Sequence, residues 1–495
     1  MRLTNNPRFK KIIDAILKEI GSDQSLYLVG GCVRDSILNL DFNDLDFVMP
    51  VDPTRFAKVV AKRLKAGFFV LDDERCTARI VYTCDSGEIF PLDFVRFTGN
   101  SLEDDLRSRD FTINAMAISI HNLSTIIDPL GGRMDLEQGC LRLCNPNALL
   151  DDPVRVLRGI RLACQFNLGF NQGLESKFRE AAPFLPNTSN ERQRDEFIKI
   201  LGGHNPAEGL DYCRKFQVFD VMIPNLVEQE AVPASPPHAL PLFDHTVAVV
   251  HHLDQLLIAI EDFANPKVHH PGWFVKMIGA IAPFASQLNV FFKEEITPGR
   301  TKRSLALLGA LLHDLGKPMT MKLREDGRLH YYNHAQIGAE LAQDVTRRLK
   351  LSNTECDWVT QLVRHHMDLL PIINGKTMTT PRVIYRFFQK VDEVGLAIIL
   401  HTLADTLGTF GDFLSVEKWD QTVSVAQKFL SAWYNHKNSI VSPTPLLDGH
   451  DIQMIFGLKP GVKIGRLLDS LLEAQVSGEV NTRLEAETFL SKKIK

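Results

Sequence analysis

GGCVRD, residues 30–35, and DLDF, residues 44–47, decide the fold of this chain. An apolar run before the first segment predicts a strand, and the residues after the glycines open a helical stretch. Gly30 and Gly31 let backbone N–H groups approach a phosphate closely, and a helix N-terminus favours negative charge. Arg34 can add a bidentate contact to the same phosphates. Alone, such a pair of glycines is more often an ordinary tight turn.

Asp44 and Asp46 make the pattern specific. In an extended strand alternate residues project from the same face, so both carboxylates can hold a shared pair of cations. Two hard cations about 3.5–4 Å apart can activate an attacking 3′-hydroxyl and stabilise a leaving pyrophosphate. A lone DxD is more often a solvated edge, but one that follows a glycine turn of this kind indicates nucleotide chemistry.

These two segments resemble the first motif of class II tRNA nucleotidyltransferases and bacterial poly(A) polymerases, within the polymerase β superfamily. Residues 109–117, RDFTINAMA, are similar to the family's next motif, with Ser108 in place of its first arginine. The resemblance implies that Arg109 touches the incoming nucleotide. Residues 128–132, DPLGG, match the turn that ends the family's head domain.

Residues 151–161, DDPVRVLRGIR, resemble the family's EDPxRxxRxxR helix. Cytosine and adenine both offer an exocyclic amine beside a ring-nitrogen acceptor, so Asp152 can accept from the amine while Arg155 donates to the ring nitrogen. Uracil or guanine would leave buried polar groups unpaired, and the pair could therefore discriminate strongly. We expect Arg158 and Arg161 to lie towards the triphosphate or in structural contacts. Without the head motifs, a solvated arginine face would be the better interpretation.

Two further details concern the same region. Asp151 replaces the family's usual glutamate, which we expect to be tolerated because the next two functional positions are kept. Residues 191–197, ERQRDEF, resemble the family's ERxRDE segment. We interpret this segment mainly as an ion-paired helix that braces the neck.

The length of the connection before the segment RDFTINAMA indicates which nucleotides the enzyme adds. Only residues 97–101 separate the strand expected around Pro91 to Arg96 from the segment LEDDL, residues 102–106. Family members that build the whole CCA end carry a flexible loop here, whereas CC-adding enzymes lack it and do not switch from CTP to ATP. The short connection favours CC addition and leaves CCA addition, A addition and poly(A) synthesis as alternatives.

Histidines and aspartates mark the helical stretch that follows. In the order H…HD…H…H…D, such residues can converge from separate helices on a divalent metal whose bound water attacks a phosphate ester. The order resembles HD-superfamily phosphohydrolases, which accompany some bacterial tRNA nucleotidyltransferases and act on 2′,3′-cyclic phosphates and phosphomonoesters. A degenerate structural domain is the alternative, and the sequence does not decide which of two adjacent histidines binds. The residues are His245, His313, Asp314, His334, His365, His366 and Asp405.

The chain is expected to be an α+β protein, with a polymerase β-like head followed by an all-helical neck, HD body and tail. The strands expected in the head are Tyr27 to Val29, Phe47 to Met49, Phe68 to Leu71, Ala78 to Thr83 and Phe90 to Val95. The expected divisions are a head at 1–145, a neck at 146–230, a proline-rich linker at 231–241, an HD domain at 242–414 and a tail at 415–495. The basic residues of the tail, which either hold tRNA phosphates or form a solvated face, are Lys459, Lys463 and Arg466.

Composition limits the remaining possibilities. The net charge is −4, the eight cysteines lack paired CxxC spacing, and no apolar run approaches the roughly 20 residues that span a bilayer. The first twenty residues predict an amphipathic helix rather than a signal peptide. We therefore expect a cytoplasmic enzyme with no membrane contact that uses tRNA, CTP and ATP, with Mg²⁺ in the head and Mg²⁺, Mn²⁺ or Ni²⁺ in the HD site. A non-catalytic RNA-binding protein is disfavoured because both constellations of metal ligands are intact.

Overall fold

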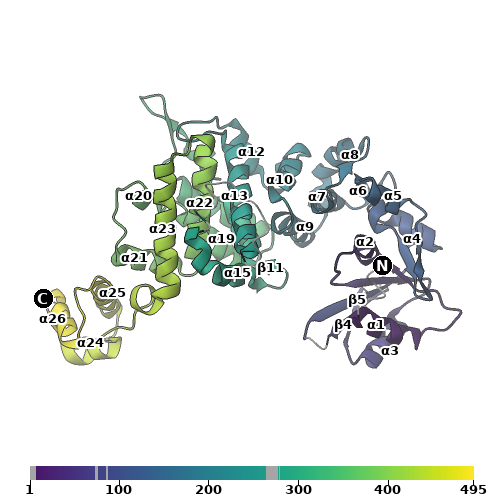
Figure 1. Cartoon of the computed structure of the whole chain (residues 1–495), viewed down its shortest axis with the longest axis horizontal. Helices are drawn as coiled ribbons and strands as arrows, with labels where there is room; N and C mark the ends of the chain where they lie inside the picture. The colour runs from purple at the N-terminus through teal and green to yellow at the C-terminus, as the bar shows by residue number, and fades with distance from the viewer. Residues whose placement is uncertain (1–6, 73–75, 85–86, 264–276, 278, 495) are drawn as a thin grey trace. The chain divides into compact units, whose positions relative to one another are not determined.

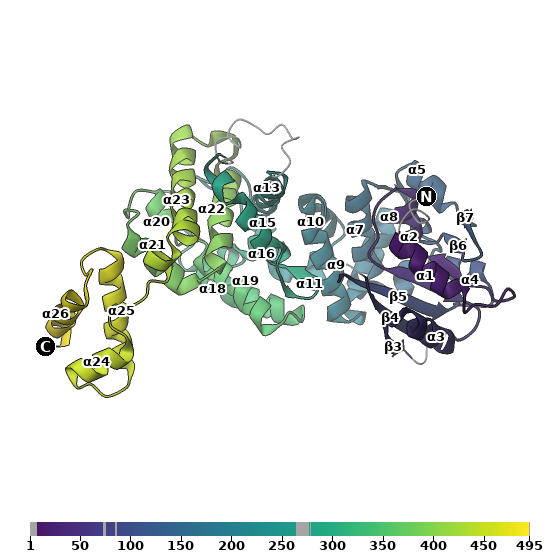
Figure 2. The same cartoon turned by 60° about the horizontal axis from the view of Figure 1, so that its bottom comes forward.

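The computed structural model describes residues 7–72, 76–84, 87–263, 277 and 279–494, and the chain divides into two compact units. The head–neck unit comprises Met1–Arg192 with Lys215–Val218, and the helical unit comprises Gln193–Arg214 with Phe219–Lys495. Figure 1 follows the chain from the head to the tail, and Figure 2 gives a second view of the same elements.

A seven-stranded sheet forms the head, in the order β3-β4-β5-β2-β1-β6-β7. Strands β2 and β5 run parallel, and the other neighbouring strands are antiparallel. The five strands predicted from the sequence are confirmed to within two residues at each end. The strands are β1 (Tyr27–Val29), β2 (Leu45–Met49), β3 (Gly67–Asp72), β4 (Thr77–Thr83), β5 (Ile89–Arg96), β6 (Ala117–Ser119) and β7 (Asn122–Ile127).

The head's main core lies between one face of this sheet and two helices. Helix α1 (Pro7–Leu17) is the amphipathic helix expected at the start of the chain, and it packs with α3 (Thr54–Leu64) beside β4 and β5 (Figures 1 and 2). Leu45, Phe47 and Met49 of β2 are buried in this core. Because side chains alternate along a strand, Asp46 projects from the opposite face of the sheet.

Shorter helices complete the head–neck unit, and the helix expected over residues 151–161 is interrupted. Pro153 has no N–H to donate and disfavours helical geometry at the residue before it. Asp152 accordingly has extended dihedral angles, φ −151° and ψ 91°. The helices are α2 (Gly31–Ile37), α4 (Leu102–Ser108), α5 (Gly132–Glu137), α6 (Ala148–Asp151), α7 (Arg155–Phe166) and α8 (Leu174–Ala181).

Gly159 allows α7 to pack closely in the neck. A Cβ atom there would lie 2.7 Å from Cζ of Phe111 and closer still to Cζ of Phe178. We expect Gly159→Ala to lower the stability of the head–neck unit by about 1–3 kcal/mol, because overpacking outweighs the roughly 1 kcal/mol gain in helix propensity. Urea unfolding measures the change.

Gly465 provides the matched control for this substitution. It lies in α25 (Val462–Val476), and a Cβ atom there would meet nothing within 4 Å. Gly465→Ala should therefore stabilise its helix slightly. Equal effects of the two substitutions would show that the two phenylalanines move apart without cost.

Helices packed side by side form the body of the helical unit. Helix α22 contacts both α13 and α19, α16 also packs against α13 and α19, and α18 packs on α19. The helices that precede the body are α9 (Asn190–Gly202), α10 (Pro206–Lys215), α11 (Val218–Met222) and α12 (Pro224–Val227). Those of the body are α13 (Leu242–Asp262), α15 (Ala285–Lys293), α16 (Lys302–Leu312), α17 (Lys317–Thr320), α18 (His334–Arg348), α19 (Asn353–His365), α20 (Leu370–Ile373), α21 (Pro381–Val391), α22 (Val394–Phe410) and α23 (Val416–Asn435).

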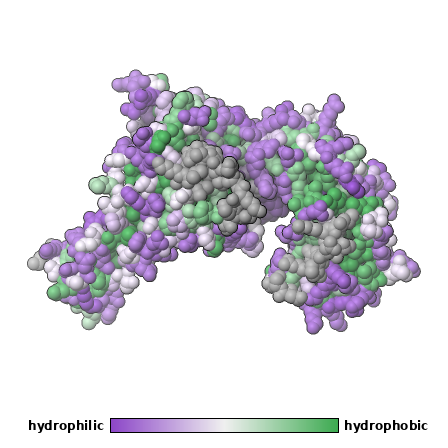
Figure 3. Space-filling model, in the orientation of Figure 1, coloured by the Kyte–Doolittle hydropathy of each residue, from purple (hydrophilic) through white to green (hydrophobic). Residues whose placement is uncertain are grey.

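The segment Val394–Phe413 is long and apolar enough to cross a membrane, but 89% of its most apolar window is buried inside the helical unit. It is therefore a core helix and not a membrane span. Hydrophilic residues lie over most of the visible face of both units (Figure 3).

The tail has a small core of its own. Leu447, Ile452, Ile464, Leu471 and Leu490 are buried in it. Helix α25 contributes Ile464 and Leu471 to this core. Its companions are α24 (Gly449–Phe456) and α26 (Arg483–Ile494).

Two- and three-residue strands complete the secondary structure. In the described part of the chain they form three small ladders. They are β8 (Cys140–Leu141) with β9 (Gly169–Phe170), β10 (Glu295–Thr297) with β11 (Arg300–Thr301), and β12 (Lys322–Leu323) with β13 (Leu329–His330).

Candidate active sites

The glycine turn and the DxD strand meet in the head. Gly30 joins β1 to α2 with a φ of 78°, which favours glycine. A Cβ atom on Gly30 would lie 3.1 Å from Oδ2 of Asp46 and 3.5 Å from Nη1 of Arg109. The turn, one carboxylate and one arginine predicted from the sequence therefore share one small region. Asp44 lies just before β2 and is exposed.

Asp93 is a third carboxylate at this place, and it was not among the residues predicted from the sequence. It pairs with Asp46 in the parallel register of β2 and β5. Burial, then Asp44 and Asp93, raise the pKa of Asp46 to about 7. Arg79 from β4 donates two hydrogen bonds of 2.7 Å to Asp93. Carboxylate oxygens gathered in this way suit a hard divalent cation, which would also relieve their mutual repulsion.

Arg34 and Arg109 are both held by neighbouring side chains. Buried Arg34 donates to Asp35 over 2.8 Å and to Asn114 over 2.5 Å, and its guanidinium lies 4.5 Å from the ring centroid of Phe166. Arg109 donates to Oδ2 of Asp105 over 3.0 and 3.1 Å. Arg109 thus stands beside the carboxylates with a fixed side chain, whereas Arg34 joins α2 to the neck.

Arg158 and Arg161 extend the arginine series along α7. Arg158 donates to Asp110 over 3.2 Å. Burial alone would raise the pKa of Asp110, but this arginine holds that pKa below its usual range. Arg161 donates to Gln165 over 3.0 Å. Both arginines make intramolecular contacts in this structure, and their contact with a triphosphate stays a prediction.

A cavity of about 570 Å³ opens where α6, α7 and the start of α9 meet. It lies wholly within the head–neck unit and contains the two residues expected to recognise a base. Its lining residues are Ser108, Leu150, Asp151, Asp152, Pro153, Arg155, Asn187, Thr188, Ser189 and Arg192.

Asp152 and Arg155 lie side by side in this cavity, with 3.8 Å between Oδ2 of Asp152 and Nε of Arg155. Arg155 uses its Nη atoms elsewhere, on the carbonyl oxygens of Ser108 and Ala148 at 3.1 Å each. Within the described part of the chain its buried Nε has no hydrogen-bond partner. Beside the carboxylate of Asp152 there is therefore one donor that no described group uses, and the surrounding atoms cover it.

Arg192 completes the arrangement around Asp152. Its Nη1 and Nη2 donate to the two carboxylate oxygens of Asp152 over 3.1 and 2.7 Å. From the sequence this arginine was expected only in an ion-paired helix that braces the neck, because nothing in the sequence shows that the first turn of α9 faces Asp152.

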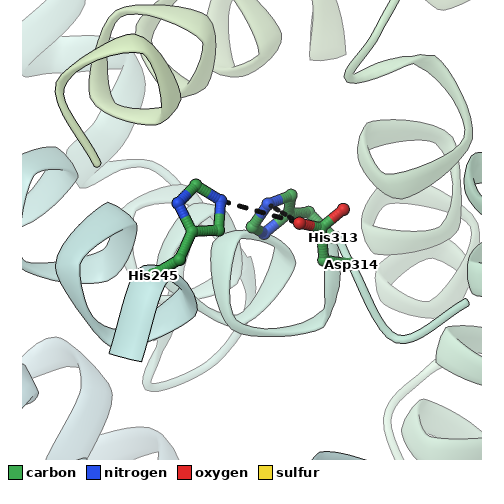
Figure 4. Close-up of side chains that lie close together, drawn as sticks. All are labelled: His245, His313 and Asp314. Atoms are coloured by element: carbon green, nitrogen blue, oxygen red, sulfur yellow. Dashed lines mark ion pairs between the residues drawn. The ribbon is translucent and has the colours of Figure 1, made fainter. Parts of the chain in front are cut away.

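The histidine cluster of the helical unit is built around Asp314. Its Oδ2 lies 3.0 Å from Nε2 of His313, which directly follows α16, and 3.6 Å from Nε2 of His245 in α13 (Figure 4). Asp405 from α22 lies 3.3 Å from Nε2 of His245. His245, His313 and Asp314 thus form one group that can hold a metal ion.

A second such group uses the other oxygen of the same carboxylate. Oδ1 of Asp314 lies 3.4 Å from Nε2 of His334 and 3.8 Å from Nε2 of His366. His365, in contrast, faces Asp368, with 3.0 Å between its Nδ1 and the carboxylate. The structure therefore directs His366, and not His365, into the cluster.

Backbone carbonyl groups orient three of these imidazoles. Nδ1 lies 2.7 Å from the carbonyl oxygen of Ala310 for His313, of Tyr331 for His334 and of Val363 for His366. A proton on Nδ1 leaves the lone pair of Nε2 free for a metal. Burial and the neighbouring histidines lower the pKa of His366 to about 3, so that ring is neutral.

Two more histidines border the cluster and were missed in the sequence analysis. His401 lies one turn before Asp405 on α22, and its ring centroid is 4.8 Å from that of His313. His238 stands over His245 with a centroid distance of 4.7 Å. The His401–Asp405 spacing could have signalled the first, but His238 lies in the proline-rich segment, where no periodic pattern applies.

A cavity of about 380 Å³ opens onto this cluster, and it lies within the helical unit. Lys317 lines it, with its Nζ 2.6 Å from Oδ2 of Asp314 and 3.2 Å from Nε2 of His238. Tyr331 and Phe410 add aromatic walls. A cation beside a metal site in an accessible cavity suits an anionic substrate such as a phosphate ester.

Comparisons with known proteins match the two domains that carry these sites. A family model described as the poly A polymerase head domain matches residues 26–142, and the HD domain model matches residues 242–407. A third, described as "Probable RNA and SrmB- binding site of polymerase A", matches residues 170–229.

Curated relatives match over nearly the whole chain. An A-adding tRNA nucleotidyltransferase from Deinococcus radiodurans is 29% identical over 94% of this chain and 94% of its own. A CC-adding tRNA nucleotidyltransferase from Thermus thermophilus is 29% identical over 93% of this chain and 92% of its own.

Solved structures share the fold. A CCA-adding enzyme in complex with ATP superposes with a TM-score of 0.64 at 21% identity, covering 99% of this chain and 96% of that one. The Thermotoga maritima CCA-adding enzyme in complex with tRNA gives a TM-score of 0.61 at 21% identity, covering 99% and 96%.

The fold and the sites define a nucleotidyltransferase head joined through a helical neck to an HD domain. This chain belongs to the class II tRNA nucleotidyltransferase and bacterial poly(A) polymerase family, as the sequence motifs predicted. Both kinds of domain generally use divalent metals, and the histidine cluster contains two groups that can hold a metal ion.

Proposed function

We propose that this enzyme adds two cytidylate residues to the 3′ end of tRNA in the cytoplasm and stops there. The observation that carries the proposal is the short connection between β5, which ends at Arg96, and α4, which begins at Leu102. In the family that this sequence resembles, members that build the whole CCA end carry a flexible loop at this connection and need it to change from CTP to ATP.

The head and neck divide the work of nucleotide addition. Asp44 and Asp46 would hold Mg²⁺, which supplies positive charge where the 3′-hydroxyl attacks and the pyrophosphate leaves. Arg109 beside them would contact the incoming nucleotide. In the neck cavity, the acceptor Asp152 and the unused donor of Arg155 would contact the amine and the ring nitrogen of cytosine.

The number of nucleotides added to tRNA transcripts with different 3′ ends distinguishes CC, CCA, A and poly(A) addition. Purified protein with Mg²⁺ should extend a tRNA transcript that ends at the discriminator base by two residues, with CTP alone or with CTP and ATP together. It should leave a CC-ended transcript unchanged. Gel analysis of transcripts ending before C, after C and after CC measures this directly.

The other outcomes have definite meanings. Completion to CCA would mean that the short connection does not limit the enzyme. Addition of a single A to CC-ended tRNA would make it an A-adding enzyme, as the Deinococcus relative is named. Long A tails on any RNA would assign it as a poly(A) polymerase.

We further propose that the HD site hydrolyses phosphomonoesters or 2′,3′-cyclic phosphates with a bound divalent metal. The two groups of possible ligands that share Asp314 support this proposal. Imidazole and carboxylate donors suit Mn²⁺ or Ni²⁺ as well as Mg²⁺. Lys317 would bind the phosphate in the adjoining cavity.

A further inference from the structure

The arrangement around Asp152 carries an inference that rests on the proposed function. Asp152 occupies the break between α6 and α7, where its backbone is extended and its carbonyl oxygen accepts a hydrogen bond from the N–H of Arg155 over 3.1 Å. Its side chain is 20% exposed, and both of its oxygens are bound by the guanidinium of Arg192. A planar fork of two parallel hydrogen bonds fixes the position and the plane of a carboxylate, which one bond does not.

The location of Arg192 is unfavourable without that partner. It lies in the first turn of α9, where the helix dipole favours anions over cations. Half of its side chain is exposed, and it lines the same cavity as Arg155. The carboxylate of Asp152 offsets the unfavourable dipole, so the two side chains form one unit at the cavity wall.

The paired carboxylate can still accept another hydrogen bond. Each carboxylate oxygen has two acceptor positions, and Arg192 uses one on each. Oδ2 of Asp152 therefore keeps a position for an exocyclic amine, on the side where the unused Nε of Arg155 lies 3.8 Å away.

We propose that Arg192 is a positioning residue for base selection. It holds the carboxylate of Asp152 in the one orientation in which the acceptor of Asp152 and the donor of Arg155 match the edge of cytosine. Without Arg192, the carboxylate of Asp152 would rotate away from a uracil carbonyl. The repulsion between that carbonyl and the carboxylate, which disfavours UTP, would then be lost. Arg192 thus sets the choice between CTP and UTP without touching the reacting atoms.

Steady-state kinetics of wild type, Arg192→Ala and Arg192→Lys with CTP and with UTP test the proposal. For Arg192→Ala we expect kcat/KM for CTP to fall about 10- to 100-fold, the range for loss of a charge-assisted hydrogen bond. The ratio of kcat/KM for CTP to that for UTP should fall about tenfold. Lysine should restore only part of the ratio because its single ammonium cannot form the fork.

Arg133→Ala is the matched control, since Arg133 is an exposed arginine of the same unit that pairs with Glu137. It should leave both the rate and the CTP/UTP ratio unchanged. Loss of a purely structural arginine would lower kcat/KM equally for CTP and for UTP. An unchanged CTP/UTP ratio in Arg192→Ala therefore overturns the proposal. Faster CTP use by Arg192→Ala would also overturn it, because Arg192 would then be competing with the base. Failure of the wild type to add C would instead contradict the proposed function.

Discussion

Asp44→Ala is expected to reduce nucleotide addition by a factor of about 1,000 or more. The metal ions supply several kcal/mol of charge stabilisation, and each 1.36 kcal/mol corresponds to a tenfold change in rate. Asp44 is exposed and lies outside β2, so loss of its carboxylate should leave the fold intact. Extension of a tRNA transcript with CTP, measured under single-turnover conditions, gives the loss.

Glu137→Ala provides the control for this substitution. Glu137 is an exposed acid of the head that pairs with Arg133 at the surface. Its replacement should change neither nucleotide addition nor phosphate-ester hydrolysis by the HD site. Addition of nucleotides that survives in Asp44→Ala would refute the assignment of the head metal site.

His366→Gln is expected to lower phosphohydrolase activity at least a hundredfold while nucleotide addition is kept. His366 directs Nε2 at Oδ1 of Asp314, so its loss removes a ligand from the second metal group. Even the loss of groups that merely orient metal ligands costs 10- to 100-fold in affinity or activity. Hydrolysis of a chromogenic phosphomonoester and of a 2′,3′-cyclic nucleotide, with Mn²⁺, Ni²⁺ or Mg²⁺ added, measures the effect.

The neighbouring histidine allows a closely matched control. His365 is bound to Asp368 outside the cluster, so His365→Gln should retain most of the activity. Equal losses in the two variants would show that the helix end, and not a metal ligand, is being tested. A wild type without hydrolysis of either substrate would favour a degenerate HD domain.

The sequence predicted those features that depend on neighbouring residues. The glycine turn and the five strands of the head are local patterns, and the strands were confirmed to within two residues at each end, although Asp44 lies just before β2. Asp93 was missed because its approach to Asp46 depends on the parallel pairing of β2 with β5. No sequence spacing records that register.

The neck also contains contacts that depend on tertiary packing and that the sequence did not predict. The family's helix was expected over residues 151–161, whereas Pro153 disfavours helical geometry at Asp152 and so separates α6 from α7. The pairing of Asp152 with Arg192 then depends on how α9 packs against that break. Packing of helices also decides that His366, and not His365, faces Asp314.

Arg155 has a consequence for how new specificities arise in this enzyme. Its Nη atoms bind carbonyl oxygens at Ser108 and Ala148, so the side chain that we propose contacts the base also joins the head motif to the neck. A substitution at Arg155 would disturb the backbone beside Arg109 together with base recognition. Evolutionary change of the accepted base is therefore more accessible through the residues around Asp152, where the backbone of the head is not involved.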